Sequence, residues 1–395
     1  MQIPLYKSEA GLFVPPKSVV KDEILHVIHN TFTAEVREYG KQLEKEGFTC
    51  YMCREIPAGS KNSGLINLAC TYIREDMHIS MFFAGAFHLL TISVSAPTAL
   101  PPQSVSEYKN RTPITLTQCN VETGMSYAVQ NRDGSFILMD GGKLLEEDVC
   151  KLYNFLKEKT PEGEKIRIAL WMFSHADYDH VHLATAFVKK YCNEIDIDGV
   201  AYQFPDPYTT TYYYRSPEEI NGNAIALLEA FEQYHPNTVT YHLHNGQRFL
   251  FPGVEIEILW TADQLEPHAF ISANCTSSAW RLKFDNGKTA LFLGDCMSDA
   301  CRRIAHIYGD YLKSDILQVA HHGLTGGDKG LYQLIDPDIC LWPTSPQRFN
   351  GTTEGHKNRW CLGDGECDFN AWIRDDSIRK REHYPLGETV TIMMD

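Results

Sequence analysis

Short apolar runs that end in polar residues or glycine recur in the second part of the chain. Four of them are Phe136-Ile-Leu-Met139 before Asp140-Gly-Gly142, Ile166 to Phe173 before Ser174-His175, Thr289 to Leu293 before Gly294-Asp295, and Asp315 to Ala320 before His321-His322-Gly323. Continuous apolar runs of this length predict buried strands. Because function concentrates on the loops that leave such strands, we expect the four polar endings to gather at one edge of packed sheets.

The first hundred residues have a different pattern. We expect a helix that is capped by Thr33, has an apolar face of Val36, Tyr39 and Leu43, and ends at Gly47. Strands are expected at 48–56 and 65–73, followed by a hairpin from Ile79 to Val94 around Ala84-Gly85-Ala86. The hairpin run is interrupted by Gly85 and His88 and is shorter than the about 20 apolar residues that span a bilayer, so no membrane segment is expected.

A cluster of prolines separates these two parts. Pro97, Pro101, Pro102 and Pro113 lie among serine and glutamine, a composition typical of a linker. We therefore expect a small α+β domain of unknown role, with its linker, at residues 1–112, and a larger domain at residues 113–395. The total of 395 residues agrees with two or three domains of roughly 150 residues each.

Composition and charge narrow the class of protein. With 43% hydrophobic and 22% charged residues, the chain has the composition of a globular protein. The net charge is −15, which argues against a protein that coats nucleic acid, because such binding comes from neutralising phosphates. The N-terminus lacks the charged and apolar segments of a signal peptide, so we expect a cytoplasmic protein. The sequence predicts no particular oligomeric state.

The twelve cysteines are expected to be reduced thiols, as is usual in the cytosol. Cys50-Tyr-Met-Cys53 has the spacing of a redox or zinc motif, but it lies in a strand-like run without a second pair nearby. Burial of these residues as small apolar side chains is the favoured interpretation. Cys361 and Cys367, which flank a glycine-rich turn, are interpreted in the same way.

The strongest chemical signal is His175-Ala-Asp177-Tyr-Asp179-His180, which places four potential ligands within six residues between a strand and a helix. Imidazole and carboxylate groups bind Zn, Mn and Fe. A solvated polar turn is the alternative interpretation, but it does not explain why lysine and arginine are absent here. The pattern therefore predicts a metal site.

This segment resembles the His-x-[His/Asp]-x-Asp-His signature of the metallo-β-lactamase superfamily. Asp140-Gly-Gly142, Gly294-Asp295 and His321-His322-Gly323 occur in the order of that superfamily's other motifs. The aspartate at the second position, Leu312 to Gly323, and Ala273-Asn-Cys-Thr-Ser-Ser278 resemble the branch of ComEC-like domains and phosphorylcholine esterases. The resemblance covers roughly residues 113–395 and implies an αββα sandwich of α/β (α+β) class with a metal site at one edge.

The resemblance also implies roles for individual residues. His175 and Asp177 would bind one of two divalent metal ions, Asp179 and His180 the other, and Asp295 would bridge them. Either His321 or His322 would complete the second site; we favour His322 as the ligand and His321 as a substrate-contacting or proton-transfer group. Asp140 would support the loops, and Asp179 and His321 are the candidate catalytic residues.

The metal preference and the ligand set are partly open at this point. Aspartate in place of the commoner histidine makes the first site harder and favours Mn or Fe without excluding Zn. Many members supply a further histidine before the bridging aspartate, and the candidates here are His182, His235, His242, His244 and His268. His242 and His244 would share a strand face, but an ordinary, partly exposed histidine is the favoured interpretation of each.

The resulting hypothesis is a two-metal hydrolase that uses a metal-bridging hydroxide, acting on a phosphodiester or another small molecule. The alternatives are a lactone, thioester or β-lactam hydrolase on the same site and a non-catalytic metal-binding interaction protein. The substrate could be contacted by an aromatic stretch containing Tyr202, Phe204, Tyr208 and Tyr212–Tyr214, or by the segment Gln347–Tyr384 with its basic tip Arg379-Lys-Arg381. Sheet-covering aromatics and a solvated loop are the respective alternatives.

Overall fold

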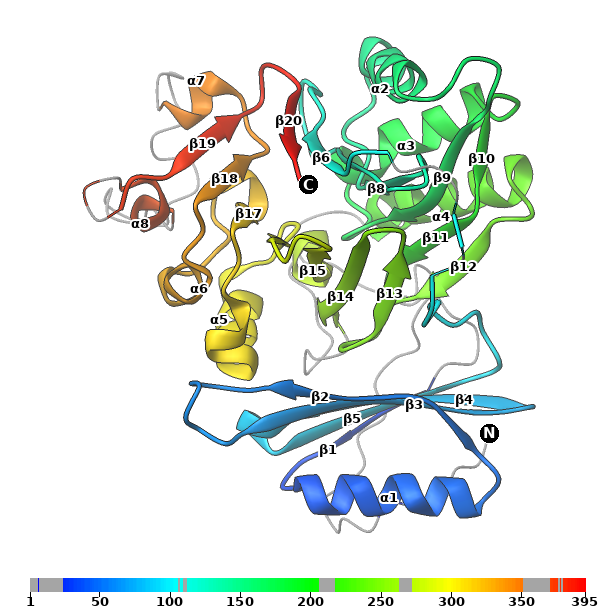
Figure 1. Cartoon of the computed structure of the whole chain (residues 1–395), viewed down its shortest axis with the longest axis vertical. Coiled ribbons are helices and arrows are strands. Elements are labelled where there is room, and N and C mark those ends of the chain that lie inside the picture. The colour runs from blue at the N-terminus through cyan, green and yellow to red at the C-terminus, as the bar shows by residue number, and fades with distance from the viewer. Residues whose placement is uncertain are drawn as a thin grey trace.

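A computed structural model describes Tyr6 and residues 24–105, 107–108, 112–205, 217–262, 272–350, 370–375, 377 and 379–395. The chain forms an N-terminal unit and a larger unit of two sheets with helices on their outer sides (Figure 1). Within the described residues, no helix has the length and apolar character needed to cross a membrane.

The N-terminal unit is an antiparallel sheet with a helix on one face. Its elements are β1 (Ile24–Ile28), α1 (Thr33–Lys45), β2 (Thr49–Pro57), β3 (Ile66–Arg74), β4 (Met77–Ala84) and β5 (Leu89–Ser95), and the strands have the order β1-β5-β4-β3-β2. Val36, Tyr39 and Leu43 of α1 are buried against the sheet, as predicted. The predicted hairpin is confirmed as β4 and β5. The predicted cap was one residue late, because Phe32 is the N-cap and its N–H donates to Glu35 Oε2 at 2.9 Å.

The larger unit contains two mixed sheets. The first has the order β12-β11-β9-β8-β7-β6-β20, with β10 beside β9, and comprises β6 (Thr115–Gln118), β7 (Tyr127–Gln130), β8 (Phe136–Met139), β9 (Ile166–Met172), β10 (Ile195–Ile197), β11 (Gly199–Tyr202), β12 (Val239–His242) and β20 (Val390–Met393). The second runs in sequence order through β13 (Arg248–Phe251), β14 (Val254–Trp260), β15 (Ala279–Phe284), β16 (Thr289–Phe292), β17 (Ile316–Gln318), β18 (Ile339–Trp342) and β19 (Glu382–Pro385).

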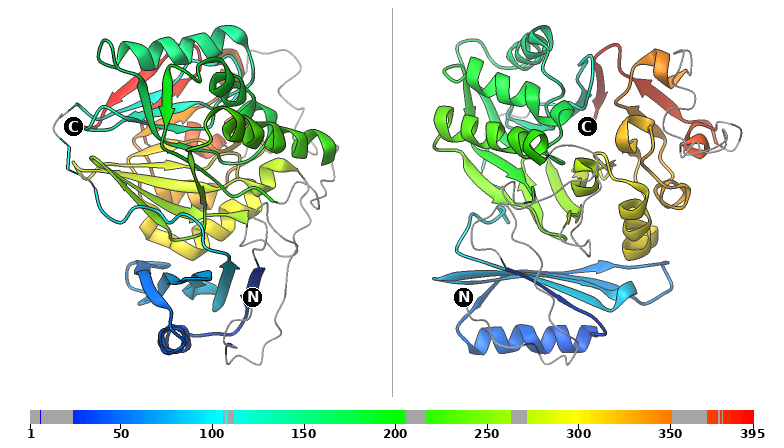
Figure 2. Two further views of the ribbon diagram at one scale, coloured as in Figure 1. Left: turned by 90° about the vertical axis from the view of Figure 1, so that its right-hand side faces the viewer. Right: turned by 180° about the vertical axis from the view of Figure 1, so that it is seen from behind.

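Helices cover the outer sides of the two sheets (Figures 1 and 2). They are α2 (Glu146–Glu158), α3 (Tyr178–Lys190) and α4 (Pro217–Tyr234) on the first sheet, and α5 (Ser298–Tyr308), α6 (Lys329–Ile335), α7 (Pro346–Phe349) and α8 (Ala371–Arg374) beside the second. In β8, Ile137 and Met139 enter the core between the sheets, whereas Phe136 and Leu138 pack under the helices. Burial of both faces explains the unbroken apolar runs of the sequence. The predicted fold class, an αββα sandwich with a small N-terminal α+β domain, is confirmed.

The N-terminal sheet packs its second face on the larger unit. Met52, Ile56 and Phe82 share an apolar cluster with Leu259 and Tyr308 of the larger unit. The side-chain amide of Asn67 donates to Ile307 O at 3.1 Å, and Asp310 N donates to Gly59 O at 3.0 Å. The outer face of the second sheet is therefore covered partly by helices and partly by another sheet.

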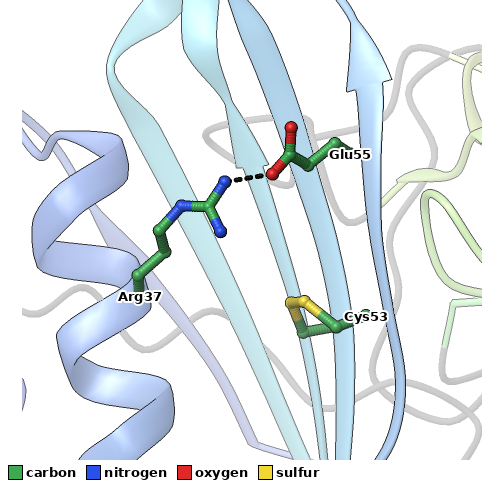
Figure 3. The surroundings of a disulfide bond; sticks show 4 residues. Arg37, Cys53 and Glu55 are labelled. Carbon is green, nitrogen blue, oxygen red and sulfur yellow. Dashed lines mark hydrogen bonds and ion pairs between the residues drawn. A yellow bond between two sulfur atoms is a disulfide. The ribbon is translucent and has the colours of Figure 1, made fainter.

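Two cysteines of the N-terminal unit depart from the prediction of reduced thiols. Cys53 of β2 lies opposite Cys70 of β3, and the two form a disulfide next to the Arg37–Glu55 ion pair (Figure 3). The partner of Cys53 is thus 17 residues away and not Cys50, because strand pairing brings opposite side chains together. The other described cysteines form no disulfide: Cys50, Cys119, Cys150, Cys192, Cys275, Cys296, Cys301 and Cys340. Cys361 and Cys367 lie outside the described residues.

Candidate metal centre

The four polar strand endings meet at one edge of the sandwich, as predicted. β8 and β9 are parallel neighbours in the first sheet, and β16 and β17 are parallel neighbours in the second. Ser278 N, just before β15 of the second sheet, donates to Ser174 O of the first sheet at 2.8 Å, and His321 N donates to Gly294 O at 3.0 Å between the two endings of the second sheet. This edge gathers residues that are far apart in the chain.

The side chains at this edge form two overlapping groups with metal-ligand geometry. One group is His175, His180 and Asp295, the other is Asp179, His180 and His322, and the ligand atoms within each group lie within 4.8 Å of one another. Asp295 Oδ2 lies 3.4 Å from Nε2 of His180 and 3.4 Å from Nε2 of His322. Asp179 Oδ2 lies 3.3 Å from His322 Nε2.

The inner atoms of this cluster are buried without hydrogen-bond partners. They are Nε2 of His175, His180 and His322, and Oδ1 of Asp295. A buried polar atom without a partner is costly, and buried polar groups are almost always paired. Three imidazole nitrogens and a carboxylate are also the donors that Zn, Mn and Fe accept. The residues present therefore fit a divalent metal centre.

The outer edges of the three imidazoles are held by hydrogen bonds. His180 Nδ1 lies 2.9 Å from Asp140 Oδ2, His175 Nδ1 lies 3.0 Å from Ser174 Oγ, and His322 Nδ1 lies 2.7 Å from Pro343 O. A proton on each Nδ1 leaves the lone pair on Nε2, which is how outer partners orient metal-binding histidines. Asp140 also accepts from Ser174 N and Oγ at 2.8 Å each, so it supports the loop as the resemblance implied.

The backbone at these turns is unusual. His321 and His322 have φ values of 48° and 55°, in the left-handed region that residues other than glycine rarely adopt. Both lie in the 3-10 turn η5 (Ala320–Gly323). Gly294 also has a positive φ of 52°, and a Cβ there would lie 2.7 Å from Ser174 Cβ. Such conformations persist only where the surrounding structure holds them, and they cluster at functional sites.

Asp177 and His321 lie at this edge but in neither metal group. Asp177 is the N-cap of α3, and its Oδ1 accepts from Tyr178 N at 2.8 Å. His321 Nε2 lies 2.7 Å from Asn274 Nδ2, and its Nδ1 lies 3.1 Å from Thr325 Oγ1. The geometry therefore favours His322 over His321 as the ligand. It also places His180 in both groups, whereas the sequence assigned His175 with Asp177 and Asp179 with His180; a metal-binding role of Asp177 stays a prediction.

Burial and the neighbouring charges shift the pKa values of this cluster. Burial, together with the nearby His180, holds the pKa of His175 well below its usual value. Burial also opposes the charge on His322, but the carboxylates of Asp295 and Asp179 outweigh it and raise the pKa of His322 to about 10. For His180, Asp295 and Asp140 likewise overcome burial and raise the pKa well above the usual value. Burial works against the charge on Asp295, yet His322 and His180 keep its pKa well below the usual range.

The other candidate histidines are elsewhere in the described structure. His182, His235, His242 and His244 join neither metal group, and His182 Nε2 instead lies 2.7 Å from Asn223 Oδ1. His268 lies outside the described residues. Among the described residues, the cluster of His175, His180 and Asp295 is thus not extended by a further histidine.

The predicted substrate walls are only partly described. Tyr202 and Phe204 stack with ring centroids 4.7 Å apart and are buried under the helices of the first sheet, which agrees with the sheet-covering interpretation. Tyr208, Tyr212–Tyr214 and residues 351–369 lie outside the described residues. In the basic tip, Arg379 and Arg381 both form ion pairs with Asp336, and a phosphate-contacting role of this tip stays a prediction.

Gln318 has a structural role that the sequence did not suggest. Its side-chain oxygen accepts from Leu293 N and Gly294 N at 2.8 Å each, which fixes the turn that carries Asp295. The available signal was a single amide residue inside the otherwise apolar end of the run 315–320. A buried amide needs partners, so such a residue indicates a hydrogen-bonding task at the strand end.

No protein-family model matches the chain, and no curated protein matches it in sequence. Solved structures similar to it include the metallo-β-lactamase fold protein YhfI from Bacillus subtilis, with 12% identity and a TM-score of 0.40 over 71% of this chain and 100% of that chain. Another is CmlA, a diiron β-hydroxylase from Streptomyces venezuelae, with 10% identity and a TM-score of 0.42 over 73% of this chain and 55% of that one.

A third similar structure is a long form RNase Z from yeast, with 8% identity and a TM-score of 0.34 over 60% of this chain and 37% of that one. These likenesses concern the fold alone. None of the three descriptions points to the ComEC-like or phosphorylcholine-esterase branch.

Proposed function

We propose that this chain is a metal-dependent hydrolase of the metallo-β-lactamase superfamily that acts on a phosphodiester. The observation that carries the proposal is the set of buried ligand atoms without partners around Asp295, contributed by three separate strand endings. Two divalent cations at such a site supply a water of lowered pKa and stabilise charge on a phosphoryl oxygen.

The charges of the residues favour a monoanionic substrate. The three carboxylates that the sequence assigns to the metals, Asp177, Asp179 and Asp295, contribute three negative charges, so a pair of dications would leave one positive charge on these groups before solvent binds. A phosphodiester carries one negative charge and two non-bridging oxygens, and both properties suit this excess. A neutral ester or lactam would gain less from it.

His321 is the residue we assign to proton transfer. Its Nε2 lies 3.9 Å from Asp295 Oδ2, and burial lowers its pKa, so the ring is neutral at physiological pH. Asn274 and Thr325 hydrogen-bond its two ring nitrogens and fix its orientation. A neutral, oriented imidazole beside the reacting group is suited to accept a proton during the reaction.

The test uses purified protein and the activated diester bis(4-nitrophenyl) phosphate. We expect close to two transition-metal equivalents per chain and measurable turnover, both lost in Asp295→Ala. Asp299→Ala is the matched control, since Asp299 is an exposed carboxylate on α5 that pairs with Arg302. Unchanged turnover in Asp295→Ala would reject the site.

The substrate class needs a separate comparison. A lactone, a thioester and a β-lactam should each be hydrolysed with a lower kcat/KM than the phosphodiester by the same preparation. A higher kcat/KM for one of the carbonyl substrates would be compatible with the metal site but would contradict the choice of a phosphodiester as substrate. Metal binding without turnover of any of these substrates would instead indicate a non-catalytic protein.

A further inference from the structure

A second polar site lies between the two units of the chain. A cavity of about 430 Å³ is bordered by β2 of the N-terminal unit and by β13 to β16 on the outer face of the second sheet. None of its lining residues belongs to the metal centre. The charged residues that line it are Arg54, Arg248, Glu255, Glu257, Arg281 and Lys283.

The strand pattern explains why charges collect here. In β14 and β15, the alternate residues Ile256, Ile258 and Leu282 enter the core between the sheets. The residues between them therefore point outward, and strand register pairs Glu257 with Arg281 and Glu255 with Lys283. The N-terminal sheet covers this part of the sheet together with Tyr311 of the 3-10 turn η4 (Gly309–Leu312).

Part of this charge is already neutralised within the protein. Glu257 is nearly inaccessible and accepts from Arg54 at 3.1 Å, from Arg281 at 2.8 Å and from the Tyr311 hydroxyl at 2.9 Å. Both arginine side chains are less than one fifth exposed. This network joins the N-terminal unit to the second sheet and accounts for one carboxylate and two guanidinium groups.

The remaining cations are poorly paired. Arg248 reaches Glu255 only at 3.8 Å, and its Nε is buried without a hydrogen-bond partner. Lys283 makes no ion pair within the described part of the chain. Four cations against two carboxylates leave the lining with an excess of two positive charges, although the whole chain carries −15. A buried donor without a partner beside excess positive charge is the environment that an anion would satisfy.

We propose that this cavity binds a small phosphate monoester or free phosphate. A phosphate monoester carries a charge of about −1.5 to −2 at neutral pH. One such group would therefore balance the two excess positive charges of the cavity lining. Guanidinium groups present several N–H donors in a plane and bind phosphate oxygens in pairs. The cavity volume is within the usual range of about 300–1,000 Å³ for small-molecule sites. The site is independent of the proposed hydrolysis, because it shares no residue with the metal centre.

The experiment measures binding of inorganic phosphate to the metal-loaded full chain by isothermal titration calorimetry, with malonate as a dicarboxylate probe. The variant is Arg248→Gln with Lys283→Gln; neither residue belongs to the Glu257 network, so folding should be retained. Lys288→Gln, at the exposed turn between β15 and β16, is the matched charge-removal control. Asp295→Ala reports on phosphate bound at the metal centre.

We expect saturable phosphate binding that persists in Asp295→Ala and Lys288→Gln and weakens at least about tenfold in the double variant. Lys283→Arg keeps the charge and should bind phosphate as the unaltered chain does. If the double variant fails to fold, Lys283→Gln alone is compared with Lys283→Arg, and phosphate binding should weaken only in Lys283→Gln. Binding lost in Asp295→Ala but kept in the double variant would overturn the proposal, as would the absence of saturable binding. Tighter binding of malonate than of phosphate would overturn the choice of ligand.

Discussion

The Nδ1 atom of His180 lies 2.9 Å from Oδ2 of Asp140, and both side chains are buried. The Asp140 carboxylate holds a proton on Nδ1, so Nε2 is the ring nitrogen that faces Asp295 and His322. His180 is also the only residue shared by the two metal groups among the described residues. Asp140, which comes from a neighbouring strand, thus controls the residue at the middle of the centre.

Asp140→Asn should weaken metal binding without unfolding the chain. The amide keeps the shape of the carboxylate but removes the charge that stabilises the Nδ1 proton of His180. Loss of such an outer partner typically costs about 10- to 100-fold in metal affinity. Competition with a chromogenic chelator measures the change. Asp196→Asn, an exposed carboxylate paired with Lys165, is the control and should bind metal normally.

The two adjacent histidines should separate metal binding from turnover. His322→Ala removes a ligand of the second group and should lower the metal content, whereas His321→Ala should keep the metal and lower kcat by about 10²- to 10⁴-fold. Metal analysis and steady-state kinetics on the same preparations provide both readouts. Loss of metal in His321→Ala with retention in His322→Ala would reverse the two assignments.

Metal binding should release protons. In the metal-free chain, Asp295 and Asp179 overcome the effect of burial and raise the pKa of His322 to about 10, so this imidazole is protonated at neutral pH. A metal ion needs the neutral ring, and affinity should therefore rise as the pH is raised toward 10. Titration calorimetry in two buffers of different ionisation enthalpy counts the protons, and the count should fall in His322→Ala.

The same pKa shift sets a stability trend for the metal-free chain. A folded-state pKa raised above the usual value of about 6.5 means that protonated His322 stabilises the fold, fully so below that value. This contribution is lost as the pH rises through about 10. Thermal unfolding of the metal-free chain should show a decline over this range that is smaller in His322→Ala. An equal decline in both proteins would contradict the assignment.

Gly141→Ala should destabilise the loop that follows β8. A Cβ at this position would lie 2.6 Å from Ala184 Cβ and 2.8 Å from Ala184 N on α3. Forcing α3 to shift should cost about 1–3 kcal/mol of unfolding free energy. Gly222→Ala in α4 is the contrasting variant, because no atom lies within 4 Å of its added Cβ. Chemical denaturation should show a gain of about 0.5–1 kcal/mol there.

The Cys53–Cys70 disulfide should be detectable as a linked peptide pair. Digestion under non-reducing conditions, followed by mass spectrometry, should yield one crosslinked species that disappears on reduction. Closing a loop of 17 residues is worth about 3 kcal/mol in the chain-entropy account. Reduction should therefore lower the unfolding midpoint of the unaltered chain. The Cys53→Ser, Cys70→Ser double variant should yield no crosslinked peptide pair. Reduction should lower its unfolding midpoint less than that of the unaltered chain.

Much of the architecture follows from local pattern. The apolar runs at 136–139 and 289–293 are strands, and Val36, Tyr39 and Leu43 form the buried face of α1, because side-chain periodicity of 2 or 3.6 residues is a local property. The convergence of the four polar endings was also predictable, since parallel neighbouring strands place their ends at one edge.

Contacts between separate elements were not predictable in the same way. The sequence suggested Cys50 as the relevant neighbour of Cys53, but strand register pairs Cys53 with Cys70. Nor did the sequence indicate that Arg54 of the N-terminal sheet forms an ion pair with Glu257 of β14. Such distances depend on how elements pack, and residue spacing along the chain carries no information about that packing.

The residues of the candidate centre illustrate this division. The sequence by itself determined which ligand types are present and that each follows a buried strand, because both properties are written into short segments. Only the tertiary structure decided that His180 joins two groups, that His322 faces Asp179 while His321 faces Asn274, and that Asp177 caps α3. The physical reason is that side-chain direction at a turn depends on backbone angles, here the left-handed pair at His321 and His322, which are fixed by packing across the two sheets.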